Sequence, residues 1–281
     1  MLAISNWSCL RAITFLIPML LLDFGQQHVS AATVANDSIT KAPTLEFVTE
    51  EFPPLNFNNN GQVDGFGADI VREILRRENL AAPLTVLPWA RAYKMAQIEA
   101  NVGLFCLVRS VEREKLFQWI GPIGNIESKL YANSNSTLHI DNIIDARDAN
   151  GVIALREGYS AQLLQRLGFK NVWPVTNATE AVRLMRISND KTLLLLTANA
   201  LPEAMAKTAT PLDALKPVMT VMKTQIYIGF SLSTSPALIT QLQHALDQMK
   251  TDGSFAAIYK KWFPREKPPG LEREADILPP N

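Results

Sequence analysis

The chain has 281 residues, of which 47% are hydrophobic and 19% are charged, and its 27 basic and 27 acidic residues give a formal net charge of zero. This length and composition suit one large or two small globular domains. A nucleic-acid-binding protein needs a surplus of basic residues to neutralise phosphate, so the balanced charge argues against a nucleic-acid partner.

The N-terminal segment has the three parts of a secretory signal peptide. Arg11 supplies a positive charge, Ala12 to Leu22 form an apolar run that is too short to cross a bilayer, and Val29 and Ala31 place small residues before a cleavage site. We therefore predict a signal peptide over 1–31 and an exported, soluble product.

Cysteine usage predicts neither a disulfide nor a metal site. Cys9 would be removed with the signal peptide, which leaves Cys106 as the only cysteine of the exported chain. Cys106 lies in the apolar run VGLFCLV, where we expect an inert, buried thiol. The chain has no H-E-x-x-H motif and no Cys/His cluster, so no metal is predicted.

Strands and helices alternate along the first half of the exported chain. We predict strands at 45–50, 83–89 and 102–108, with helices at 68–79 and 90–100. This order is typical of an α/β unit built on a parallel sheet.

The same pattern then restarts. After an extended segment at 127–133, we predict strands at 151–155, 171–175 and 191–197 and helices at 159–168 and 178–188. A second extended segment at 225–233 leads to two final helices at 235–253 and 254–263, and we expect 265–281 to be disordered.

A G-x-G pair at Gly65 and Gly67 raises the question of a nucleotide site. A dinucleotide-binding turn needs a third glycine, and the third position of the pattern is Ile70. The loop before it is also long and rich in asparagine. We therefore interpret the glycines as turn residues that let Asp69 occupy the first turn of a helix, and we predict no cofactor.

Three segments in the correct order resemble family 3 of the bacterial extracellular solute-binding proteins. They are VTEEFPPLNFNNNGQVDGFGADIVREIL, LTVLPWARAYKMAQIEANVGLFCLVRSVEREKLFQWIGPI and ALDQMKTDGSFAAIYKKWF, and the resemblance spans about 45–263. The PWARAY variant is similar to a branch of the family whose ligands are mostly unassigned.

The resemblance implies the type II fold of periplasmic binding proteins, in which two hinge strands join two α/β lobes. Lobe 1 would comprise 44–128 and 227–264, and lobe 2 would comprise 132–222. It further implies a periplasmic monomer, not an enzyme, that closes on a small polar solute in the cleft between the lobes. The solute would be amino-acid-like or an organic acid, and the closed form would dock to an ABC permease.

In lobe 1 the resemblance points to an aromatic site. Phe52 and Trp89 would be its two aromatic walls. Glu50 or the neighbouring Glu51 would hold an ammonium group of the solute, and Arg91 would point into the cleft.

Arg113 matches the arginine with which amino-acid-binding members hold a carboxylate, because its planar fork allows bidentate hydrogen bonds. Shortly before it the family usually has small or hydroxyl residues, but this chain has Val108 and Arg109, and only Ser110 remains. We expect Ser110 to contact the solute and Arg109 to replace part of the site.

In lobe 2, Arg156 follows a strand, and Tyr159 and Ser160 begin a helix whose free amides would bind an anion. The family often has an aspartate for a ligand amine after the strand that ends at Thr197, but this chain has Thr197 and Asn199. The neutral pair predicts a solute with more acceptors than cations.

Two other classes remain open. A ligand sensor of this fold would have to dock to a separate signalling partner, since no signalling module is expected after the fold. A dehydratase-like enzyme is the second alternative. His139 and His244 are far apart in the sequence and belong to no Ser/His/Asp arrangement, which argues against it.

Overall fold

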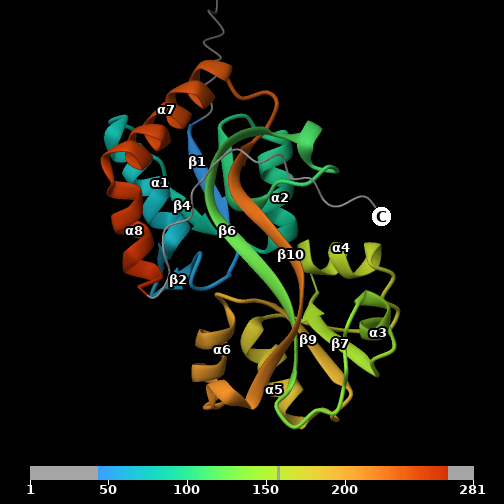
Figure 1. Cartoon of the computed structure of the whole chain (residues 1–281). Coiled ribbons are helices and arrows are strands. Elements are labelled where there is room, and N and C mark those ends of the chain that lie inside the picture. Colours follow the sequence, from blue (N-terminus) through green and yellow to red (C-terminus); the bar gives the residue numbers. More distant parts are fainter. Residues whose placement is uncertain (1–43, 157–158, 265–281) are drawn as a thin grey trace, which may run out of the picture. The chain divides into compact units, whose positions relative to one another are not determined.

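Two long strands, β6 (Gln118–Asn133) and β10 (Leu215–Phe230), run side by side and antiparallel through the middle of an eight-stranded sheet (Figure 1). Their pairing extends from Leu215 opposite Asn133 to Phe230 opposite Gln118. The strand order of the sheet is β4-β1-β5-β10-β6-β9-β7-β8. The two long strands therefore join two groups of shorter strands.

We call the elements on the β5 side of the sheet lobe 1. Its strands are β1 (Glu46–Thr49), β4 (Leu84–Val86) and β5 (Val102–Val108), with a hairpin of β2 (Phe57–Asn59) and β3 (Gln62–Asp64). Its helices are α1 (Phe66–Arg77), α2 (Trp89–Ile98), α7 (Pro236–Asp252) and α8 (Ser254–Trp262). Strand β1 pairs in parallel with β4 and β5, and β5 pairs antiparallel with β10.

We call the elements on the β9 side lobe 2. Its strands are β7 (Gly151–Leu155), β8 (Val172–Val175) and β9 (Thr192–Thr197). Its helices are α3 (Ile143–Arg147), α4 (Tyr159–Arg166), α5 (Ala178–Ile187) and α6 (Leu201–Lys207). Strand β7 pairs in parallel with β8 and β9, and β9 pairs antiparallel with β6.

The structure describes residues 44–156 and 159–264, and all of them belong to one compact unit. The predicted signal peptide, 1–31, and the predicted disordered tail, 265–281, lie outside the described residues. Within the described ranges, no helix combines the length and the apolar character that crossing a membrane requires.

The α/β class predicted from the sequence is confirmed, and β5 and β7 have the predicted bounds. Two local predictions had the wrong bounds. The second strand ends at Val86 and Trp89 begins α2, because Pro88 caps the helix and cannot continue the strand. The predicted segment 127–133 is the end of the longer strand β6, and residues 225–230 of the predicted segment 225–233 are the end of the longer strand β10. The exact limits of the lobes stay a prediction.

The G-x-G pair allows close packing. Gly65 has a φ of 119°, a conformation that favours glycine, and a Cβ there would lie 2.5 Å from the carbonyl oxygen of Leu55. A Cβ at Gly67 would collide with the Sγ of Cys106. Both glycines therefore let α1 approach the loop after β1 and strand β5, which agrees with a structural role.

Asp69, in the first turn of α1, joins two of the three segments that carry the family resemblance. Its Oδ2 accepts hydrogen bonds from Lys261 Nζ at 2.7 Å and from Trp262 Nε1 at 2.8 Å, both in α8. The aspartate thus links the last helix of lobe 1 to the first helix, so its carboxylate stabilises the fold rather than binding a solute.

Candidate functional site

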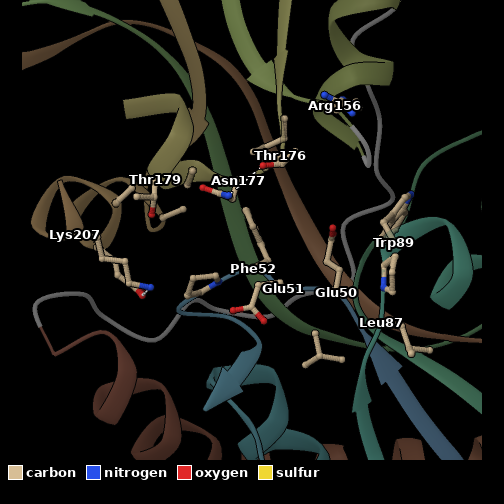
Figure 2. A pocket seen from close by; sticks show the side chains of 18 of the residues that line it. Glu50, Glu51, Phe52, Leu87, Trp89, Arg156, Thr176, Asn177, Thr179 and Lys207 are labelled. Atoms are coloured by element: carbon tan, nitrogen blue, oxygen red, sulfur yellow. Dashed lines mark hydrogen bonds and ion pairs between the residues drawn. The ribbon is translucent and has the colours of Figure 1, made fainter. Parts of the chain in front are cut away.

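A cavity of about 730 Å³ lies between the two lobes, and we call it the outer cavity (Figure 2). Lobe 1 lines it with the loop after β1 and the segment that leads from β4 into α2, through Glu50, Glu51, Phe52, Pro53, Val86, Leu87, Pro88 and Trp89. Lobe 2 lines it with the ends of β7 and β8 and with α5 and α6, through Leu155, Arg156, Thr176, Asn177, Ala178, Thr179, Arg183, Ala200, Glu203, Ala204 and Lys207.

A smaller cavity of about 50 Å³, the inner cavity, shares four lining residues with the outer one: Glu50, Phe52, Trp89 and Leu155. Apolar side chains dominate its other walls, from Leu55, Val108, Ile126, Met222 and Ile226, together with Cys106. Its remaining polar lining residues are Ser128, Tyr159, Ser160 and Thr197.

The strand directions explain why these residues meet. Glu50 directly follows β1, Arg156 directly follows β7, and Thr197 is the last residue of β9. In sheets of this kind ligands bind beyond the carboxyl ends of the parallel strands. Here the carboxyl ends of strands from both lobes border the same cavities, so one solute can be contacted from two sides.

The loop after β1 is held in a tight turn. Its backbone closes through a hydrogen bond from Phe52 N to Asn56 O at 2.6 Å, and the Asn56 side chain donates to the Glu50 carbonyl. Glu51 accepts a hydrogen bond from Asn58 N at 2.9 Å. Figure 2 shows the result: Glu50 lies between Phe52 and Trp89 and points across the cavity. These contacts fix the positions of the predicted acid and of one predicted aromatic wall.

Trp89, the other predicted aromatic wall, lines both cavities. As the first residue of α2 it stacks on Tyr93, one helical turn further on, with ring centroids 5.4 Å apart and an interplanar angle of 30°. The helix therefore supports the indole from behind while its free side borders the cavity.

Arg113 has only 2% of its surface exposed and lines neither cavity. Its Nη1 donates to Val108 O at 3.2 Å and its Nη2 to Gln162 Oε1 of α4 at 3.1 Å. The guanidinium carbon lies 5.2–5.7 Å from the ring centroids of Trp89, Tyr93 and Tyr159. Burial lowers the pKa of Arg113 from its ordinary value.

The Arg113 guanidinium is not fully satisfied by these partners. Its Nε is buried and has no hydrogen-bond partner among the residues that the structure describes. The contact to Gln162 crosses from lobe 1 to lobe 2, so Arg113 lies at the interface of the lobes. Its predicted role as a carboxylate clamp stays a prediction.

Three other predicted site residues of lobe 1 line neither cavity. Arg109 pairs with Glu114, with Nε 2.6 Å from Oε2, and lies over the rings of Trp119 and Tyr227. Ser110 is buried and donates to Glu112 at 2.6 Å. Arg91 is exposed on α2. Arg109 and Ser110 thus contact other residues of lobe 1, and the roles of all three in binding a solute stay predictions.

In lobe 2, Tyr159 joins the inner cavity to the lobe interface. Its hydroxyl accepts a hydrogen bond from Arg166 Nη2 at 2.6 Å, and Arg166 in turn contacts Glu112 of lobe 1 at 2.6 Å. Burial raises the pKa of Tyr159. Leu163, on the same helix, is 4% exposed and packs in the apolar core of lobe 1. Helix α4 is therefore a direct contact between the lobes.

Thr197 is 5% exposed, and its Oγ1 has no hydrogen-bond partner among the described residues. A buried polar atom without a partner is unfavourable, which makes it a candidate for contact with a bound molecule. Cys106 differs from it, because burial raises the pKa of its thiol and keeps it protonated, as predicted for an inert cysteine.

Sequence reasoning missed the part of the outer cavity that α5 and α6 line. Asn177 caps α5 by accepting from Glu180 N at 2.8 Å, and Glu180 accepts in return from Thr176 N at 2.8 Å. The pattern T-N-x-x-E is a recognisable helix start that would have placed Thr176 and Asn177 at the sheet edge. Glu203 and Lys207 lie on α6, a short helix without a clear periodic signal.

The described residues contain no group of three or more His, Cys, Asp or Glu side chains that could hold a metal ion.

Several solved structures share this fold. The arginine-, lysine-, histidine-binding protein ArtJ from Geobacillus stearothermophilus matches with a TM-score of 0.68 and 16% identity over 82% of this chain and 98% of its own. A histidine kinase sensor domain with similarity to periplasmic binding proteins matches with a TM-score of 0.70 and 16% identity, over 80% and 98%. At these identities the likeness establishes the fold alone.

An ancestral amino acid-binding protein, described as a precursor of cyclohexadienyl dehydratase, matches with a TM-score of 0.66 and 19% identity, over 81% of this chain and 98% of its own. A search of curated proteins found no match. The model of one protein family covers most of the described structure, over residues 46–265. The chain therefore belongs to the bacterial extracellular solute-binding proteins, family 3.

Proposed function

We propose that this protein captures a small polar solute, amino-acid-like or an organic acid, in the periplasm and delivers it to an ABC importer. The observation that carries the proposal is the outer cavity, whose volume of about 730 Å³ is typical of small-molecule sites and whose walls come from both lobes. Membership of an extracellular solute-binding family supports the location and the delivery step.

The mechanism follows from a site with two walls. A solute that touches Phe52 and Trp89 of lobe 1 as well as Tyr159 and Ser160 of lobe 2 binds the closed arrangement better than an open one. Binding therefore shifts the population toward closure by as much as the affinities for the two arrangements differ. The closed form would then be recognised by a membrane permease, and the protein would act as a monomer.

A sensor that docks to a signalling partner is the second candidate, and the likeness to a histidine kinase sensor domain favours it. Both candidates share the same capture step and differ in the partner of the closed form. An enzymatic role is less well supported, because the dehydratase-related structure is itself an amino acid-binding protein. We propose that the protein does not turn over its solute.

Thermal unfolding in the presence of amino acids, polyamines, organic acids and short peptides tests the capture step. A solute at 100 times its Kd adds about 2.7 kcal/mol to the free energy of unfolding. For a protein of this size that corresponds to a rise of about 5–11 °C in Tm. A shift confined to one chemical class would support the proposal. No shift with any class would overturn it, and product formed from a bound solute would overturn the non-enzymatic role.

A further inference from the structure

We propose that the solute is an extended zwitterion bound with its amine innermost: the ammonium group lies in the inner cavity beside Glu50 and Thr197, and the acidic group lies in the outer cavity against Arg156 and Arg183 of lobe 2. The inference rests on the proposed function, because it names the class of solute for the same site.

The charged side chains around the outer cavity differ between the lobes. Lobe 1 contributes two acidic residues, Glu50 and Glu51. Lobe 2 contributes three basic residues, Arg156 at the end of β7, Arg183 of α5 and Lys207 of α6, and one acidic residue, Glu203 of α6. A solute that spans the cavity is therefore favoured when its two ends carry opposite charges.

Of the three basic residues that lobe 2 places around the outer cavity, one is paired with a neighbouring acid. Lys207 pairs with Glu203 on the same helix at 2.7 Å. Arg156 and Arg183 are both exposed and form no ion pair with another described residue, although the charge of Arg156 also acts on Glu180 of α5. Figure 2 shows Arg156 on the side of the cavity opposite Glu51. Planar guanidinium groups bind carboxylates in a bidentate manner, so an acidic group fits this wall.

The inner cavity suits a cation. Glu50 is its one acidic lining residue, and its charge also interacts with that of the buried Arg113. Thr197 lines the same cavity, and its Oγ1 has no hydrogen-bond partner among the described residues, while most of the other walls are apolar. An ammonium group carries three donors and no acceptor, so it can donate to both oxygens. A solute carboxylate in the same place would face Glu50 with a like charge in an apolar setting, which is unfavourable.

The size of the inner cavity restricts what enters it. Its volume of about 50 Å³ holds only a few atoms, since one water-sized group needs ~10–15 Å³ of this kind of space. A straight aminoalkyl end fits, whereas a branched or aromatic end does not. The proposal differs from the expectation that Thr197 and Asn199 had raised, a solute with more acceptors than cations, because Thr197 and Glu50 line the same small cavity.

In the proposed orientation, the acidic group of the solute binds Arg156 and Arg183 and does not contact Arg113. The two terminal nitrogens of Arg113 already donate to Val108 O and Gln162 Oε1, and the residue lines neither cavity. The carboxylate of the solute therefore meets lobe 2, in contrast to the clamp on lobe 1 that the family resemblance implies.

Calorimetric titration with straight-chain ω-amino acids of four to eight carbons, each compared with the alkylamine and the alkanoate of the same length, tests the inference. We expect one ω-amino acid to bind at least about tenfold more tightly than either one-ended analogue, because a charged hydrogen bond contributes about a factor of ten or more. Arg156→Gln should remove most of the advantage of the ω-amino acid over the alkylamine.

Thr197→Val tests the amine site more selectively than a substitution of Glu50 would. Glu50 also favours the charged form of Arg113, so its substitution would change both the amine site and Arg113. We expect Thr197→Val to weaken binding of the amine-bearing solutes about tenfold. Thr240→Val, on the exposed part of α7, is the matched control and should change nothing.

The outcomes separate the inference from the proposed function. Tight binding of alkanoates or of uncharged solutes, or unchanged binding to the Thr197→Val variant, would overturn the inference and leave solute capture intact. If neither this series nor the wider panel of solutes binds, solute capture and the inference both fall.

Discussion

The two lobes face each other in two different ways. In one region they enclose the outer cavity, which has a volume of about 730 Å³. In the other region the loop after β5 contacts α4 directly. We call the second region the α4 contact. It consists of Glu112 and Arg113 of lobe 1 with Tyr159, Gln162 and Arg166 of lobe 2. The outer cavity leaves room for a solute, whereas the α4 contact joins the lobes without one.

Groups of the protein itself form an ion pair, a hydrogen bond and a cation–π contact between the lobes. In the closure that we propose, each such contact would favour the closed arrangement before any solute arrives, so closure would not depend on the solute alone. The apparent affinity rises in proportion to that population, since only the competent fraction binds.

Replacing Trp89 should have the largest effect, because its ring borders both cavities and also lies 5.2 Å from the guanidinium carbon of Arg113. We expect Trp89→Ala to lower the free energy of unfolding by about 2–3 kcal/mol and the solute affinity by about tenfold or more. Urea denaturation and calorimetry measure the two effects.

Trp119→Ala is the matched control for this prediction. Trp119 packs against Phe117 and Tyr227 in lobe 1 and lines neither cavity. It should destabilise the protein without loss of affinity. Equal losses of affinity in the two variants would show that Trp89 supports the fold rather than the solute.

Gln162→Leu tests the α4 contact by itself. The substitution removes the acceptor of Arg113 Nη2 and leaves that nitrogen without its partner in lobe 2. We expect a loss of about 1–2 kcal/mol in the free energy of unfolding, measured by urea denaturation, since a polar group that loses its partner retains its desolvation cost. Gln165→Leu, an exposed position on the same helix, should cost less than about 0.5 kcal/mol. Similar values for both would argue against a role of Gln162 in joining the lobes.

Glu112 and Glu114 offer a smaller and more selective test. Both belong to the segment after β5 and both pair with an arginine, but Glu112 pairs across the lobes with Arg166 and Glu114 within lobe 1 with Arg109. An exposed pair contributes about 0.2–1 kcal/mol, so Glu112→Gln should weaken solute binding up to about fivefold. The radius of gyration of the solute-free protein, measured by X-ray scattering, should also rise. If Glu114→Gln has the same effects, the ion pair across the lobes has no special role.

The smallest expected effect is a dependence on pH. Hydrogen bonding from Ser110, together with Arg166, holds the pKa of Glu112 below its ordinary value of 4.5. A carboxyl whose pKa is lowered in the closed form contributes fully above that ordinary value and loses its contribution as the pH falls further. The radius of gyration of the solute-free protein should therefore rise below about pH 4.5. In the Glu112→Gln variant this part of the rise should be absent, and an unchanged rise would exclude Glu112 as its source.

Local sequence signals predicted most elements but not the extent of the long strands. Strands β5 and β7 are short apolar runs with clear ends, and their bounds were predicted correctly. In β6, Gly121, Pro122 and Gly124 act locally as breaks, so only its second half was predicted. Pairing with β10 and, in its lobe 2 half, β9 holds the strand together, and a local pattern does not contain that information.

For the candidate site, the sequence named residues that line a cavity where they follow a strand, and it could not place a residue whose position depends on distant partners. Glu50, Phe52, Arg156 and Thr197 were named from strand ends, and all four line a cavity. The enclosure of Arg113 depends on α4, whose residues are distant in the sequence, and spacing alone could not reveal it.

The bond between Asp69 and α8 also constrains when the protein can fold. The two partners of Asp69 lie 192 and 193 residues further along the chain. Lobe 1 therefore cannot complete its packing until almost all of the described chain has been synthesised, whereas every helix of lobe 2 is available earlier. Contacts of such sequence separation slow folding. A newly made chain would thus keep its first helix incompletely packed for most of its synthesis.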